Sequence, residues 1–105
     1  MEKETFLSDQ IYQIFETTGT LKSRLDELAQ KLKKVLGVQV YFCEIIGNRW
    51  SFFAGDMTLD IPQHRLWLNK KFGMMAGEIR CPEQEWTEAV EQVKNILNRE
   101  KAGWL

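Results

Sequence analysis

The sequence is poor in the residues from which catalytic and metal sites are built. It contains one histidine, two cysteines and seven dispersed glycines. His64 falls in a predicted strand, and no helix places a cysteine or carboxylate beside it at the i+3 or i+4 spacing of a zinc site. Nucleophile elbows, HExxH motifs and phosphate-binding glycine loops are missing as well. We therefore expect a protein that is not an enzyme and that carries no metal and no cofactor.

Targeting and membrane signals are also missing. The first residues, Met1 to Glu4, lack the basic start and apolar stretch of a signal peptide. No apolar segment approaches the ~20 residues that span a bilayer. Cys43 and Cys81 form neither a disulfide-rich scaffold nor a CxxC pair. These features predict a cytoplasmic protein with reduced thiols and no membrane partner.

An excess of positive charge is missing too. The chain has 14 basic and 15 acidic residues and a formal net charge of −1. Attraction to phosphate groups, which dominates nucleic-acid affinity, therefore has no obvious source. The densest basic cluster is Lys31, Lys33 and Lys34, which we interpret as the solvated side of a helix. Nucleic acid is not an expected partner.

What is present is the composition of one folded domain. Hydrophobic residues make up 44% of the chain and charged residues 28%, without the polar excess of disordered proteins. A chain of 105 residues can bury about 65% of the surface that its unfolded form exposes. No linker, repeat or low-complexity segment divides it, so residues 1–105 are interpreted as a single domain.

Helical periodicity predicts two helices in the first third of the chain. Apolar residues recur at helical spacing from Glu4 to Thr17, and a second run starts after Thr20, a suitable N-cap, and ends at Gly37. The second run carries a leucine stripe that also has the a/d spacing of a coiled coil. The stripe would therefore pack either on the chain's own sheet or on a partner chain as a dimer helix. Its leucines are Leu21, Leu25, Leu28 and Leu32.

Beyond Gly37 the apolar pattern takes the two-residue period of strands. Gly47-Asn48 suits the tight turn of a first hairpin, and a polar connector over residues 55–63 leads to a second hairpin. The predicted strands are Val38–Ile46, Arg49–Ala54, His64–Asn69 and Lys71–Arg80.

Pro82 suits the first turn of a last helix, which is predicted to stop at Gly103. Two helices therefore precede the strands and one follows them. The expected fold class is α+β, with an antiparallel sheet of four to five strands and the element order α-α-β-β-β-β-α.

Both faces of this predicted sheet are apolar. An antiparallel sheet with one covered face should alternate apolar with polar residues, so the pattern indicates that something covers each face. Three arrangements satisfy this: the first helix folds over the second face, a second subunit covers it, or an apolar ligand lies between the sheet and the 55–63 connector. The residues that we expect to line this ligand site or interface are Tyr41, Cys43, Phe53, Trp67 and Met75.

Two segments of the chain resemble a known family. The run LAQKLKKVLGVQV at residues 28–40, which leads into a hairpin ending at Ala54-Gly55, is similar to the entry of a GAF domain. Residues 77–80, followed by the helix after Pro82, resemble the family's last strand and closing helix. The chain lacks the long helical insertion that the family carries between its hairpins. The profilin-like topology of the roadblock family, whose members pair through their sheets, is the second resemblance.

The GAF resemblance implies a regulatory module that binds small molecules or dimerises. Together with the doubly apolar sheet, it leads to one main hypothesis and one alternative. The main hypothesis is a non-enzymatic regulatory or assembly module that forms a homodimer. The alternative is a sensor that holds a small apolar or aromatic ligand between the sheet and the connector.

Overall fold

The computed structural model describes residues 2–16 and 19–99, with side chains placed for residues 9–16 and 19–98. This part of the chain forms three helices and four strands in the predicted order, which confirms the α+β fold class. The predicted stop at Gly103 lies outside the described residues. The elements are α1 Glu2–Glu16, α2 Leu21–Leu36, β1 Val40–Ile46, β2 Arg49–Gly55, β3 His64–Trp67, β4 Phe72–Ala76 and α3 Glu83–Arg99.

The four strands form one antiparallel sheet in the order β2-β1-β4-β3, with the two hairpins side by side. In the first hairpin, Ile46 pairs with Arg49 across Gly47-Asn48. Gly47 has φ of 64° and is the turn residue with positive φ, as a type II′ turn requires. In the second hairpin, the Asn69 side chain accepts hydrogen bonds from the backbone of Lys71 and of Phe72, each at 2.8 Å. The predicted Gly47-Asn48 turn is confirmed.

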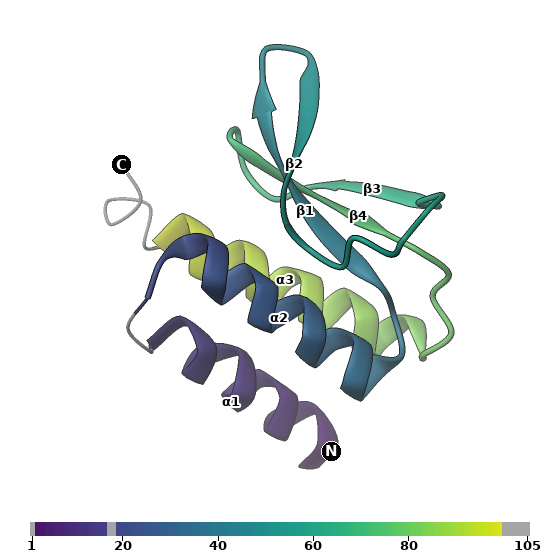
Figure 1. Cartoon of the computed structure of the whole chain (residues 1–105). Coiled ribbons are helices and arrows are strands. Elements are labelled where there is room, and N and C mark those ends of the chain that lie inside the picture. The colour runs from purple at the N-terminus through teal and green to yellow at the C-terminus, as the bar shows by residue number, and fades with distance from the viewer. Residues whose placement is uncertain (1, 17–18, 100–105) are drawn as a thin grey trace.

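The elements stack in three layers, which Figure 1 shows from the side. Helices α2 and α3 lie together against one face of the sheet, and α1 packs on the opposite side of these two helices. Ile11, Ile14 and Phe15 of α1 are buried there in the same core as α2 and α3. Helix α1 therefore does not fold over the second face of the sheet, and that interpretation of the sequence is wrong. The reason is that α2 and α3 are apolar on two sides: one side packs on the sheet, and the other packs on α1.

The leucine stripe of α2 lies inside the chain's own core. Leu25 and Leu28 are fully buried, Leu32 is 1% exposed, and Leu21 is partly buried against them. A partner helix could reach these side chains only by opening that core. Over residues 2–16 and 19–99, none of the helices has both the length and the apolar character needed to span a membrane.

Candidate functional site: the outer face of the sheet

The sheet face turned away from α2 and α3, here called the outer face, carries most of the exposed aromatic residues. Cross-strand partners in an antiparallel sheet share a face. The observed register pairs Tyr41 with Met75 and Met75 with Arg65, and it pairs Cys43 with Gly73 and Gly73 with Trp67. On the other side of β1, Cys43 pairs with Phe52 and Ile45 with Trp50. The outer face therefore consists of Tyr41, Cys43, Ile45, Trp50, Phe52, Arg65, Trp67, Gly73 and Met75.

A β-bulge decides which aromatic residues of β2 belong to this face. Phe42 pairs with Ala54, but the next residue, Cys43, pairs with Phe52, so Phe53 is an extra residue in β2. Phe53 packs against the core on the helix side, and its ring lies 5.2 Å from that of Phe72. The structure therefore places Phe53 apart from the other residues expected to line the site, and Phe52 takes that position. Nothing in the sequence marks the bulge.

The centre of the outer face is a packed group of aromatic rings. The Trp50 indole lies directly over Gly73, where a Cβ atom would collide with it. Trp67 meets Trp50 edge to face at 5.2 Å, and the guanidinium of Arg65 lies 4.9 Å from the Trp50 ring centroid, a cation–π contact. The close approach of Trp50 therefore requires a glycine at position 73. A glycine inside a strand often marks such a close approach.

These rings are packed against each other, but nothing in the described chain covers them. Trp67 is 57% exposed and Phe52 is 44% exposed. The Tyr41 ring lies 5.5 Å from Phe52 and joins it to the rest of the group. Contiguous apolar surface of this kind marks interaction sites in natural proteins. The outer face is therefore the candidate functional site.

The ionisable side chains beneath the rings are not prepared for chemistry. Burial raises the pKa of the Cys43 thiol, although the charge of Arg65 opposes the shift, and Cys43 is only 2% exposed. Burial, followed by the neighbouring Cys43, raises the pKa of the Tyr41 hydroxyl. Both groups are therefore neutral at pH 7, and a thiol nucleophile needs the opposite shift. Cys43 acts as a packing residue in the middle of the face.

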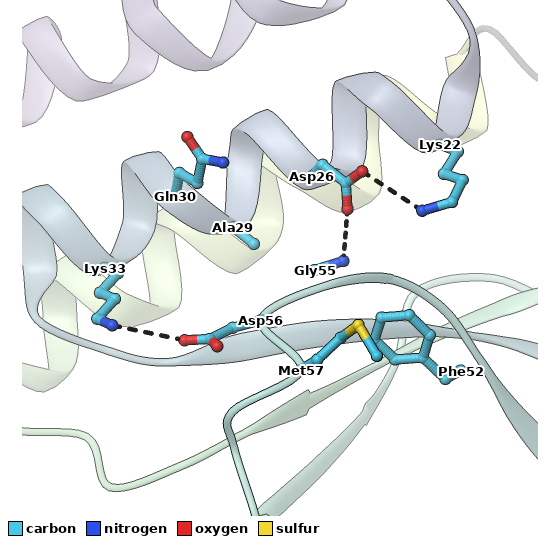
Figure 2. Close-up of a pocket in the computed structure, with 9 residues that line it drawn as sticks. All are labelled: Lys22, Asp26, Ala29, Gln30, Lys33, Phe52, Gly55, Asp56 and Met57. Carbon is cyan, nitrogen blue, oxygen red and sulfur yellow. Dashed lines mark hydrogen bonds and ion pairs between the residues drawn. The ribbon is translucent and has the colours of Figure 1, made fainter.

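Two hollows adjoin the connector, and charged side chains line part of each. The first, of about 540 Å³, lies between α2 and the end of β2 and reaches the outer face at Phe52 (Figure 2). Its charged residues already satisfy each other: Asp26 accepts a hydrogen bond from the Gly55 amide at 2.8 Å and pairs with Lys22 at 3.4 Å. The second, of about 550 Å³, is lined by connector residues and by the segments around Gly37 and Gly77. Both hollows therefore differ from a purely apolar pocket beside the connector, because Lys33 and other charged residues form part of their walls.

The connector itself is held in place by Asp56. Its carboxylate accepts hydrogen bonds from the Thr58 amide at 2.9 Å and from Gln39 Nε2 at 3.2 Å, and it pairs with Lys33 at 3.7 Å. The hydrogen bond from the Thr58 side chain, with these further contacts, holds the pKa of Asp56 below its ordinary value. The groups around Asp56 thus tie the connector to β1 and to the end of α2.

Sequence reasoning identified Tyr41, Cys43, Trp67 and Met75 as outer-face residues, and the structure brings these four together. It missed the contribution of Arg65. Within the described residues, His, Cys, Asp and Glu side chains do not gather in any group of three that could hold a metal ion. Comparisons of the chain with protein-family models, curated proteins and solved structures found no match.

Proposed function

We propose that this chain is a non-enzymatic assembly module with a regulatory role, and that it forms a homodimer through the outer face. The observation that carries the proposal is the uncovered group of aromatic rings, in which Trp67 of the edge strand β3 is 57% exposed. A sheet with apolar residues on both faces is expected to be covered on both, and α1 does not provide the second cover. The resemblance to GAF and roadblock domains, which act in regulation and assembly, supports the same function.

The chemistry of the face favours a second copy of the chain as the partner. Arg65 is the one charged residue in the face, and it already stacks on Trp50 of its own chain. A symmetric partner would therefore bury rings against rings without leaving an acidic group unpaired. Two sheets packed in this way lie about 10 Å apart, with their side chains interleaved as in a β-sandwich.

The size of the face sets the expected strength of the dimer. An aromatic side chain buries about 150–250 Å² when it is fully covered. On this basis the half-exposed Trp67 and Phe52, with the partly exposed side chains around them, provide roughly 500 Å² of surface per copy that a partner could bury. A standard protein interface buries about 800 Å² per partner. We therefore expect a dimer with a dissociation constant in the micromolar range.

The test is the oligomeric state of Trp67→Glu, measured by sedimentation equilibrium and native mass spectrometry. Tryptophan is one of the residues that commonly contribute ~2 kcal/mol when buried in an interface, so the dissociation constant should rise about 30-fold. Thr87→Glu is the matched control, because it adds the same charge at an exposed position of α3 on the helix side. It should leave dimerisation unchanged.

Two results would refute the proposal. One is a wild-type chain that stays monomeric at a protein concentration of roughly 200 µM, far above the expected micromolar dissociation constant. The other is a Trp67→Glu variant that folds and still dimerises like the wild type. Native spectra would also reveal a bound compound, and a monomer with extra mass would support the sensor alternative instead.

A further inference from the structure

The sheet has two edge strands, β2 and β3, and the described part of the chain protects them unequally. At β2, the bulge at Phe53 interrupts the regular pairing, α2 lies alongside, and the Gly55 amide donates to Asp26 at 2.8 Å. Such features keep the edge of a sheet from pairing with other chains. At the opposite margin (Figure 1), β3 pairs with β4 in a regular register, and most of its residues are exposed.

The backbone of β3 has unused donors and acceptors at this edge. In an antiparallel ladder, alternate residues direct both of their backbone groups toward the same neighbour. The Leu68 amide donates to the Phe72 carbonyl of β4 at 3.0 Å, so the even-numbered residues of β3 bond to β4. Arg65 and Trp67 therefore direct their amides and carbonyls outward. Within residues 2–16 and 19–99, no hydrogen bond reaches these groups.

A second copy of the same strand fits these groups. A two-fold axis perpendicular to the sheet pairs two β3 strands antiparallel, and an axis at Leu66 sets Arg65 of each copy opposite Trp67 of the partner subunit. Every outward amide and carbonyl of both residues then finds a partner. Moving the axis by one residue in either direction needs the amide of Gln63 or of Asn69 instead. Each of these amides already donates to a carbonyl of β4.

The side chains favour the same register. Residues directly opposite each other have Cβ atoms about 4.5–5.5 Å apart, so the guanidinium of Arg65 lies within reach of Trp67 of the partner subunit. A cation and an aromatic ring attract each other, whereas an axis at residue 65 would set two guanidinium groups side by side. On the helix side, Leu66, which is partly buried against the core, meets Leu66 of the partner subunit.

We infer that β3 is a second self-association site, at which two copies join edge to edge about an axis at Leu66. This axis is perpendicular to the sheet, so both outer faces stay on the same side and remain open. The two four-stranded sheets become one, and the aromatic surface doubles in width. Edge pairing does not need the face-to-face homodimer, and it is compatible with it because one contact uses the backbone of the edge and the other uses the face.

The first experiment measures hydrogen exchange of the Arg65 and Trp67 amides by NMR as the protein concentration is raised. Both amides should exchange about tenfold more slowly once about 90% of the chains are paired, because exchange occurs from the unpaired strand. Arg65→Pro removes one outward amide without breaking a bond to β4, whereas the control, Arg65→Ala, removes only the side chain. The Trp67 amide should therefore lose its protection in Arg65→Pro and keep most of it in Arg65→Ala. Urea midpoints check that both variants are folded.

The second experiment is a cross-link between copies. The axis sets the two Leu66 Cα atoms about 4.5 Å apart, as in a non-hydrogen-bonded pair, and a disulfide can span this distance. Leu66→Cys should therefore form a disulfide-linked dimer when oxidised glutathione is added. His64→Cys is the control and should not cross-link, because in this register the two copies of residue 64 lie about 13 Å apart along the strands. Both variants keep the free Cys43 and Cys81, so the background is the same.

The outcomes separate edge pairing from the face-to-face homodimer. A chain that self-associates while both edge amides exchange as fast as in the monomer would overturn edge pairing and leave the homodimer intact. Cross-linking of His64→Cys as readily as Leu66→Cys would overturn the axis at Leu66. Protected edge amides together with a Trp67→Glu variant that associates like wild type would support edge pairing and overturn the homodimer. A chain that stays monomeric at roughly 1 mM would overturn both.

Discussion

Leu28→Ala distinguishes a leucine stripe that belongs to the core from one that belongs to a dimer helix. Leu28 is fully buried within the chain, and truncating a buried leucine to alanine removes about 2–5 kcal/mol of stability. We expect a loss of about 3 kcal/mol. Domains of this size have a total stability of about 5–15 kcal/mol, so the variant should fold but be much weakened. With an m-value of about 1.5 kcal/mol/M, the urea midpoint should fall by about 2 M.

The assay is urea unfolding followed by circular dichroism, at a protein concentration low enough to keep the chain monomeric. Leu21→Ala is the control, because Leu21 is only partly buried at the start of α2, and it should lose less than half as much stability. If Leu28→Ala left the urea midpoint within 0.3 M of wild type, roughly 0.5 kcal/mol, and instead dissolved the dimer, the core assignment of the stripe would be refuted.

Three further changes test local features. Gly73→Ala should lower the free energy of unfolding by about 1–3 kcal/mol and shift tryptophan emission, because the new Cβ displaces the Trp50 ring; a stabilised variant would contradict this contact. Hydrogen bonds hold the pKa of Asp56 below its ordinary value, so Asp56 stabilises the fold above about pH 4 and this contribution is lost as the pH falls through the folded pKa. Urea titrations should be made at pH 6 and at pH 3, which span roughly the range of carboxylate titration. Between these two pH values Asp56→Asn should lose less stability than wild type. Thr20→Ala should lose about 1 kcal/mol, because the Thr20 hydroxyl accepts the Ser23 amide at the start of α2, whereas Thr20→Ser should retain stability in the same assay.

Features set by local chemistry could be predicted from the sequence. The leucine spacing, the Thr20 cap and the left-handed Gly37 that ends α2 identify one helix, and Gly47-Asn48 identifies one turn. These signals are local because each depends on residues that are close along the chain. The element order follows from the same kind of signal.

Features set by packing between distant segments could not be predicted. The sequence predicts that α1 has an apolar side. It does not predict that this side packs on α2 and α3 and not on the sheet. The last strand was expected to reach Arg80 and ends at Ala76, with one more backbone bond from the Gly77 amide to the Gln39 carbonyl. The place of Phe53 depends on a shift in strand pairing that leaves no local mark. Arg65 was missed because its role comes from reaching a ring on another strand.

Because of the bulge in β2, the number of residues in the strand decides which side chains form the exposed surface. A change of length there alters that surface without any change of amino-acid composition elsewhere. One extra residue lets Phe52 face outward while Phe53 and Ala54 both face the core. Deleting that residue would restore simple alternation without touching the turn or the neighbouring strands. Among related chains, insertions and deletions at this position would therefore be a direct route to a different surface on an unchanged fold.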